Sequence, residues 1–544
     1  MPELTDTGTL LYLVPEIVLV LTATGIYVVG AFGAARQDWS WMAQCGIGLA
    51  AYSLYRQASV FGDSLTGPLV IDQLAFFIRW LALGVAVLLV LLTARSARDD
   101  QGPETTGSVL LVIAGVMLSA SAADLVLLFL SLELISIPTY VLLYIARRDA
   151  SGQESAVKYF FLSILSSAVL LYGLSFLYGV GGSTHLGEIR AALQASSEMA
   201  WQAAAGPGAI SLAHVALVLI VGGLAFKIAA VPFHFYAADV YQGTTHANAG
   251  LLAVAPKIAG VVVLVRNVVA AMPGNEAFAW KLLLVMSMVT MTLGNVVALW
   301  QNNIRRMLAY SSIAHAGYLL IGLAVGLAST AQPIGYDGLA ATMLYLSVYS
   351  LATIGAFSAL SCLGKYGPAD GRLDALDGLT RSQPIIAAAM AVFMFSLAGI
   401  PPLAGFWGKL TLLGGALDVF LTPGHLTPGD PDLRRWFLVL AITGAINAAI
   451  AAAYYLRVIA VMYFRPAKAA APLVGSAGAW TAMLLCAVGV IAIGAYPGPL
   501  IGQSSRATER VRQSLKPKPS EDLERTAPAA GEQVVGRGLP RRRP

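Results

Sequence analysis

The stretches AFKIAAVPFHFYAADV, residues 225–240, and SLAGIPPLAGFWGKL, residues 396–410, decide the fold of this chain. Each belongs to an apolar run longer than one membrane crossing, and each has proline in its middle, Pro232 in the first and Pro401-Pro402 in the second. Proline removes a backbone donor and clashes with the preceding turn, so we expect both membrane helices to be broken there. Two broken helices in matching places indicate inverted repeats with an ion or substrate site at their interface.

The composition of the whole chain is typical of a polytopic membrane protein. Of the 544 residues, 57% are hydrophobic and 12% are charged, whereas a soluble domain has about 25% charged residues. Apolar runs near twenty residues without β-barrel alternation predict membrane-spanning helices. Residues 9–33 are too long and too weakly basic at their start for a cleaved signal, so we interpret them as the first span. The three cysteines show no CxxC pairing, which predicts neither a metal site nor a disulfide framework.

We predict an all-α polytopic membrane protein with about 14 transmembrane helices, in which helices 7 and 12 are broken. The predicted spans are 9–33, 41–60, 73–94, 107–121, 123–146, 157–180, 210–240, 246–271, 280–301, 306–329, 336–364, 384–418, 434–464 and 475–500. Spans 4–8 and 9–13 form two five-helix blocks with the broken helix fourth in each, which indicates inverted repeats. The predicted domains are three N-terminal helices (1–106), a first repeat (107–272), a second repeat (273–466), helix 14 (467–502) and a disordered basic tail (503–544).

The candidate functional residues are ionisable side chains inside these apolar runs. Such groups are costly in a membrane and are functional candidates by default. Lysine can lose its proton when buried, whereas arginine stays charged. Lys227 lies five residues before Pro232, Lys409 lies seven residues after Pro402, and Lys257 lies about eleven residues into its span. These three lysines are therefore candidates for proton transfer.

Glu133 lies near the middle of LVLLFLSLELISIPTYVLLYI, residues 125–145. It is on the order of 15 Å deep at 1.5 Å per residue. We favour a proton-transfer role over a carboxylate satisfied by neighbouring hydroxyl groups. A nearby lysine would titrate with it as a unit. Lys158 closely follows a polar loop, so snorkelling to the membrane surface and a functional role have equal weight.

Histidines are further candidates, because histidine titrates near neutral pH. His315 lies deepest and is the preferred relay group. For His234, two residues after Pro232, and His246, at the start of its span, a relay role and hydrogen-bonded packing remain alternatives. The chain has no nucleotide-binding, zinc or catalytic-triad signature. We therefore expect it to draw energy from an ion gradient or from partner subunits.

Several of these motifs resemble those of the antiporter-like subunits of respiratory complex I, the proton-translocating NADH–quinone oxidoreductase. The similar segments are LELISIPTYVLLY (132–144), ESAVKYF (154–160), FKIAAVPFHFYAADVYQGTTHANAGLLAVAPKIAG (226–260), RRMLAYSSIAHAGYLL (305–320) and SLAGIPPLAGFWGK (396–409). The resemblance covers most of residues 10–465. The PKIAG form around Lys257 and the LPEI-like opening at Leu13, Pro15, Glu16 and Ile17 favour the N-type subunits over the M- and L-types.

The resemblance implies a proton path through six residues: Glu133, Lys158, Lys227, Lys257, His315 and Lys409. It implies that this chain is a subunit of a translocase and binds no cofactor or metal itself. FMN, iron–sulfur clusters and quinone are expected in partner subunits, and NADH acts only through the complex. The expected partners are M-, K- and J-like membrane-arm subunits and lipids, with no nucleic acid, in a bacterial inner membrane. The loop QGTTHANAG, residues 242–250, departs from the family pattern and leaves the role of His246 open.

Two other functions are compatible with the same residues. An Mrp-type cation/proton antiporter subunit, a secondary transporter without redox partners, would share the broken helices and the buried lysines. The PKIAG match favours complex I over this alternative. A scaffold with vestigial charges is the third interpretation, and it predicts dry apolar packing around all of the lysines.

Overall fold

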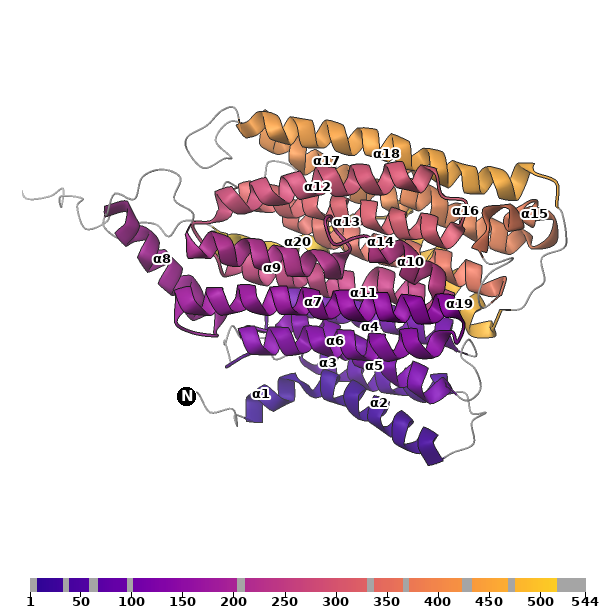
Figure 1. The fold of residues 1–544 in the computed structure, drawn as a ribbon, viewed down its shortest axis with the longest axis horizontal. Helices are drawn as coiled ribbons and strands as arrows, with labels where there is room; N and C mark the ends of the chain where they lie inside the picture. The colour runs from indigo at the N-terminus through magenta and orange to yellow at the C-terminus, as the bar shows by residue number, and fades with distance from the viewer. Residues whose placement is uncertain are drawn as a thin grey trace, which may run out of the picture.

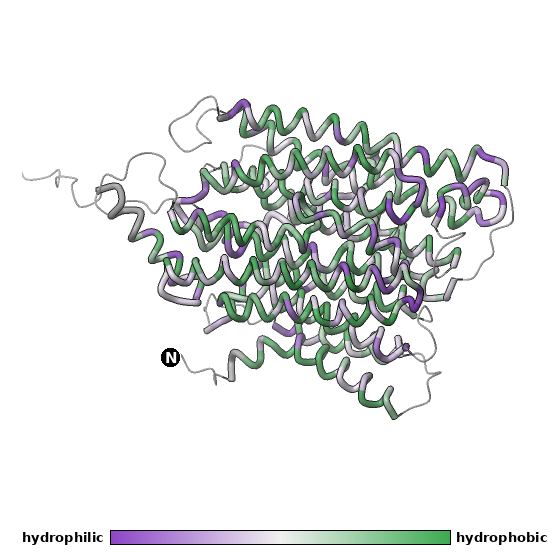
Figure 2. The backbone as a smooth tube through the Cα atoms, viewed as in Figure 1, coloured by the Kyte–Doolittle hydropathy of each residue, from purple (hydrophilic) through white to green (hydrophobic). Residues whose placement is uncertain are grey.

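The computed structural model describes residues 7–32, 39–57, 67–94, 101–202, 211–329, 337–364, 371–422, 433–467 and 475–515. Apart from three isolated β-bridges, the regular structure of these residues is helical, which confirms the all-α class. The long helices lie roughly side by side in one bundle (Figure 1). Hydrophobic residues follow the lengths of the helices, and many hydrophilic residues gather toward the two ends of the bundle (Figure 2). This distribution is the one expected of membrane-spanning helices.

The described residues form helices that range from 4 to 32 residues in length. In chain order they are α1 (Thr7–Tyr12), α2 (Val14–Phe32), α3 (Ser40–Gln57), α4 (Gln73–Thr93), α5 (Gly102–Ser121), α6 (Leu125–Ala146), α7 (Ala150–Gly181), α8 (Leu186–Gln202), α9 (Leu212–Ile228), α10 (Tyr236–Gly243), α11 (His246–Leu264), the π-helix η1 (Val265–Ala270), α12 (Glu276–Leu299), α13 (Ile304–Ala328), α14 (Gly338–Cys362), the 3₁₀-helix η3 (Leu373–Leu376), α15 (Leu379–Ser382), α16 (Pro384–Ala398), α17 (Ala404–Leu421), α18 (Leu433–Phe464), α19 (Ala477–Ala495) and α20 (Gly498–Leu515).

Helical residues occupy all fourteen predicted span positions. In the described part of the chain, twelve helices are long and apolar enough to cross a membrane on their own. Helix α3 is more polar than these twelve, and α9 and α16 are shorter apolar helices that end at the two breaks. The total of fourteen spans and the inverted relation of the two blocks therefore stay predictions.

Both predicted helix breaks are confirmed. Helix α9 ends before Ala229, which has a φ of 58°, and α10 begins at Tyr236. Helix α16 ends before Gly399, which has a φ of 88°, and α17 begins at Ala404. This left-handed conformation favours glycine, because other L-residues pay a steric cost of about 1–2 kcal/mol in it. Each break leaves the last carbonyl groups of a membrane helix in need of partners.

Two buried ion pairs connect α4 with its neighbours, one with α2 and the other with η1. Arg79 of α4 donates to Glu16 of α2 through Nε at 2.7 Å and Nη2 at 2.6 Å. Arg266 of η1 donates to both oxygens of Asp72, the N-cap of α4, at 2.5 and 2.7 Å, and to the carbonyl of Ala120 at 2.8 Å. The four charged side chains are at most 7% exposed. The planar guanidinium fork suits such two-point contacts with a carboxylate.

The prediction of a disordered tail over 503–544 is wrong for its first part. Helix α20 extends to Leu515 and packs against α4 and α14. Ala507, Thr508 and Val511 are buried on its inner face, and the Thr508 hydroxyl donates to Asp337 Oδ2 at 3.2 Å. The charged residues on the outer face made this amphipathic segment resemble a solvated tail in sequence. Residues 516–544 lie outside the described part of the chain.

Candidate functional site

A lysine and a glutamate lie near the first helix break. Lys227 is in the last turn of α9 and is 3% exposed. Its Nζ donates to the Ser136 hydroxyl of α6 at 2.5 Å. Ser136 lies three residues after Glu133, so both are on one face of α6. The half-buried Glu133 accepts a hydrogen bond from Ser167 of α7 at 2.6 Å and attracts the Lys227 ammonium electrostatically. The structure therefore brings Glu133 and Lys227 together.

Lys158 does not lie beside Glu133. Glu133 contacts Ser167 of α7, and Lys158 lies nine residues before Ser167 on the same helix, about 13 Å away along its axis. Its Nζ contacts Asp239 Oδ2 at 2.7 Å and Glu154 Oε1 at 2.6 Å, and its side chain is 39% exposed. Asp239, on α10, also accepts from Arg306 Nη1 at 2.6 Å. Lys158 thus joins an ion-pair cluster near the helix ends, as snorkelling would predict.

Lys257 lies in the middle of α11 and is 1% exposed. Its Nζ donates to the carbonyl and the hydroxyl of Ser312 on α13 and to the Tyr349 hydroxyl of α14 at 3.3 Å. The Ser312 and Tyr349 hydroxyls bond each other at 2.8 Å. The ammonium also lies 5.0 Å from the centre of the Tyr349 ring, a cation–π distance. Two neighbouring helices, α13 and α14, therefore contribute to the polar surroundings of this lysine.

Helices α9 and α11 meet at Gly260, which connects the two lysine environments. A β-carbon at Gly260 would lie 3.4 Å from Cβ of Lys227 and 2.6 Å from Cγ2 of Ile228. Gly260 is three residues after Lys257, so it shares a face of α11 with that lysine. Lys227 and Lys257 consequently lie on facing helices, about one turn apart along α11.

His315 lies one turn beyond Ser312 on α13 and is 4% exposed. Its Nδ1 is 2.5 Å from the Tyr345 hydroxyl of α14, and its Nε2 is 3.0 Å from the Tyr455 hydroxyl of α18. The His315 and Tyr349 rings lie 5.0 Å apart between their centres. Both ring nitrogens thus have a hydroxyl partner, and the tautomer depends on which hydroxyl donates.

Lys409 reaches back to the second helix break and is 5% exposed. Its Nζ donates to the carbonyls of Leu397 and Ala398, each at 2.9 Å. These carbonyls belong to the last turn of α16 and lack the partners that a continuing helix would provide. A small cavity of about 10 Å³ adjoins Lys409 and His315. That volume is about the minimum for one water molecule.

The other two candidate histidines stand apart from these contacts. His246, at the start of α11, is 1% exposed, and in the described part of the chain neither of its ring nitrogens has a hydrogen-bond partner. His234, in the first break, is half-buried, and its Nδ1 also lacks a partner there. The contacts do not join either residue to Lys227 or Lys257, so their roles stay predictions.

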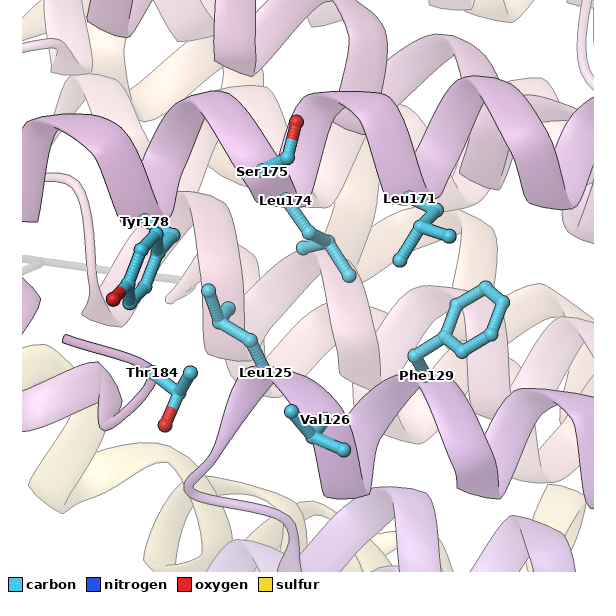
Figure 3. Close-up of a pocket in the computed structure, with 8 residues that line it drawn as sticks. All are labelled: Leu125, Val126, Phe129, Leu171, Leu174, Ser175, Tyr178 and Thr184. Carbon is cyan, nitrogen blue, oxygen red and sulfur yellow. The ribbon is translucent and has the colours of Figure 1, made fainter.

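A larger cavity than the one beside Lys409 lies on the surface between α6 and α7. This groove has a volume of about 310 Å³ and is lined by apolar residues such as Leu125, Phe129 and Leu174, with Tyr178 at one end (Figure 3). None of its lining residues is charged. Val126 and Tyr178 in its lining are exposed, so the groove faces the outside of the bundle.

The sequence interpretation missed the hydroxyl groups of the site. Ser136, Ser312, Tyr345 and Tyr349 each contact a buried lysine or His315. Hydroxyl residues among apolar ones usually satisfy a local carbonyl, so they carry little signal in sequence. The four-residue spacing of Tyr345 and Tyr349 could have indicated a shared helix face.

A family model and two relatives point to the same group of proteins. Residues 122–426 match the family described as NADH:quinone oxidoreductase/Mrp antiporter, TM. The chain is 35% identical over 470 residues to NADH-quinone oxidoreductase subunit N of Trichlorobacter lovleyi, covering 86% of this chain and 90% of the relative. It is 36% identical over 517 residues to NADH-quinone oxidoreductase subunit N of Rhizorhabdus wittichii, covering 93% and 99%.

A solved structure has a similar overall fold. A chain of respiratory complex I from Thermus thermophilus with bound aureothin superposes with a TM-score of 0.71 at 30% identity, covering 90% of this chain and 98% of that one. The residues matched by the family, 122–426, include every candidate site residue from Glu133 to Lys409.

Proposed function

Because the chain belongs to the family of NADH-quinone oxidoreductase subunit N, we propose that it moves protons along the polar groups assembled at its two broken helices. The chain is a multi-pass subunit of the membrane arm of bacterial NADH–quinone oxidoreductase, and it assembles with the other membrane-arm subunits. In this proposal FMN, iron–sulfur clusters and quinone belong to partner subunits, among which M-, K- and J-like chains are the neighbours. Redox chemistry in those chains supplies the energy.

The observation that carries the proposal is the order of buried polar side chains between the two breaks, in which the step from Lys227 to Lys257 is a packing contact of α9 with α11. It begins with Glu133 and Lys227, passes to Lys257 across the α9–α11 contact, and reaches His315 and Lys409. Lysine can exist as a neutral amine in a protein interior, so each of these lysines can accept and release one proton. Lys158 belongs to the exposed ion-pair cluster and stands outside this series.

Glu133 balances charge at the start of the series. Its carboxylate attracts the Lys227 ammonium. This attraction falls with distance, so it stabilises a positive charge on Lys227 more than one on Lys257. We assign Glu133 the role of the negatively charged partner that stabilises the Lys227 ammonium.

The alternatives have weaker support. An Mrp-type antiporter subunit shares the broad family description, but the two curated relatives above, at 35% and 36% identity, are both named subunit N. A scaffold with vestigial charges predicts dry apolar packing around the lysines. Lys227, Lys257 and Lys409 each have oxygen partners instead, which argues for function.

The test is Lys257→Ala in the assembled complex, with Lys281→Ala as the matched control at an exposed lysine of α12. We expect Lys257→Ala to abolish NADH-driven proton pumping, because the central ammonium of the series is gone, and Lys281→Ala to leave it unchanged. Proton uptake is measured with a pH-sensitive dye in inverted membrane vesicles, together with NADH:quinone activity. Wild-type pumping and quinone reduction in Lys257→Ala would show that the proposed role is wrong.

A further inference from the structure

Two tyrosines on one face of α14 lie between the lysines of the series. Tyr345 and Tyr349 are four residues apart and are each 2% exposed. The Tyr349 hydroxyl contacts Lys257 at 3.3 Å, and the Tyr345 hydroxyl contacts His315 Nδ1 at 2.5 Å. One helix therefore holds a hydroxyl group on each side of the step between Lys257 and His315.

The two tyrosines also border the cavity next to Lys409. This cavity of about 10 Å³ is lined by both tyrosines, His315 and Lys409, together with Ser396 and apolar groups. Its volume is about the minimum for one water molecule, and a buried water needs two to four polar partners, which these side chains provide. The Lys409 ammonium itself is bonded to two carbonyls and has no direct contact with His315 among the described interactions.

We propose that Tyr345 and Tyr349 are proton-carrying residues, and that one water molecule between them completes the connection from Lys257 to Lys409. The inference rests on the proton path proposed above and names the groups that close its last gap. A tyrosine hydroxyl both donates and accepts, so it can take a proton on one side and release its own on the other. Without the tyrosines and the water, the lysines and His315 form no continuous set of donors and acceptors from Lys257 to Lys409.

The proton transfers in this connection balance in atoms and in charge. Protonated His315 breaks its Nδ1–H bond and gives the proton to the Tyr345 oxygen, while the Tyr345 O–H bond breaks and its proton passes to the water. The water gives one of its protons to neutral Lys409, so tyrosine and water each end with their original number of protons. On the other side, the Lys257 ammonium gives a proton to the Tyr349 oxygen, and Tyr349 gives its own proton to the same water. The water passes one of its protons to the Tyr345 oxygen, and Tyr345 gives its own proton to Nδ1 of neutral His315. No oxidant or reductant is needed.

The matched control is a third tyrosine of the same cluster. Tyr318 is 1% exposed and lies on α13 one turn from His315, but its hydroxyl donates to the Gly444 carbonyl at 2.8 Å. Replacing tyrosine by phenylalanine keeps the ring and removes only the hydroxyl. Tyr318→Phe therefore reports the cost of a lost hydroxyl in this core without interrupting the proposed connection.

The experiment compares Tyr345→Phe, Tyr349→Phe and Tyr318→Phe in the whole complex, with NADH-driven proton uptake measured in inverted vesicles. The amount of assembled complex is measured on native gels, and the uptake rate is measured in H₂O and D₂O. We expect uptake to fall at least about tenfold in Tyr345→Phe and Tyr349→Phe, because a positioned proton-transfer group contributes about 10²–10⁴-fold. We expect Tyr318→Phe to match the wild type in rate and in solvent isotope effect.

The outcomes separate this inference from the proposed function. Wild-type pumping in Tyr345→Phe and Tyr349→Phe, with pumping lost in Lys257→Ala, would overturn the role of the tyrosines and leave the proposed function standing. An equal loss in all three tyrosine variants would assign the hydroxyls to packing and would also overturn the inference. Pumping retained in Lys257→Ala would instead refute the proposed function.

Discussion

The ion pair between Asp72 and Arg266 provides a test of how the helix bundle is held together. Both side chains are at most 5% exposed, and both carboxylate oxygens accept from the guanidinium. The change Asp72→Asn keeps the size but removes the charge and turns one of the two acceptor oxygens into an NH₂ donor. The buried guanidinium then has the amide oxygen and the Ala120 carbonyl as acceptors but no counterion. Removal of one partner of a buried pair costs about 3–5 kcal/mol.

The double variant Asp72→Asn with Arg266→Met should recover most of this loss. It removes both charges together, and a buried pair replaced as a whole is often neutral for stability. The assay is the thermal inactivation of NADH:quinone activity in detergent-solubilised complex, for both single variants and the double variant. Single variants that each cost less than about 1 kcal/mol, or a double variant as damaged as the singles, would refute the argument.

The same pair predicts an acid limit for stability. Burial acts to raise the pKa of Asp72, but the charge and hydrogen bonds of Arg266 outweigh it and hold that pKa below its usual value. The pair therefore contributes stability that is complete above the unfolded-state pKa, about 3.9, and is lost as the pH falls through the folded-state pKa. Proton pumping per assembled complex should be unchanged by the substitutions at neutral pH, because Asp72 lies outside the series of lysines.

Two further substitutions test the arrangement of the site. Gly260→Ala should lower pumping, because its β-carbon would lie 2.6 Å from Ile228 and push α9 away from α11, at a cost of about 1–3 kcal/mol. The control is Gly250→Ala on the same helix, whose β-carbon would meet nothing closer than 3.4 Å and should be tolerated. Pumping assays on assembled complex check both. Lys158→Met should cost less than about 1 kcal/mol in thermal stability and should keep most of the pumping, because its ion pairs are half-exposed. A loss of pumping as complete as in Lys257→Ala would contradict the placement of Lys158 outside the series.

The sequence predicts the broken helices and the buried lysines because their signals are local. Proline in the middle of an apolar run breaks a helix wherever that run is placed. The depth of Lys257 follows from counting residues along its span, and the structure has it 1% exposed. The sequence places Lys409 only by its distance from Pro402, and its contact with the carbonyls of α16 required the structure.

Pairings between helices required the structure. The resemblance places both Glu133 and Lys158 in the proton path, but the antiparallel packing of α6 and α7 sets Glu133 opposite Ser167 and leaves Lys158 beside Asp239. Neither the relative height nor the rotation of two neighbouring helices can be read from one sequence. Tyr345 was missed for a different reason, because an aromatic residue in an apolar helix is usually part of the core.

The number of N–H groups on Lys257 and Lys409 decides whether each lysine can lose a proton and keep its contacts. An ammonium has three N–H groups and a neutral amine has two. Lys409 uses two of them on the Leu397 and Ala398 carbonyls, so it can release one proton and still hold the end of α16. Lys257 has three acceptors, and one of the Ser312 and Tyr349 hydroxyls can turn around and donate to the single lone pair of the neutral amine. Both side chains can therefore change charge without leaving a neighbouring carbonyl unsatisfied.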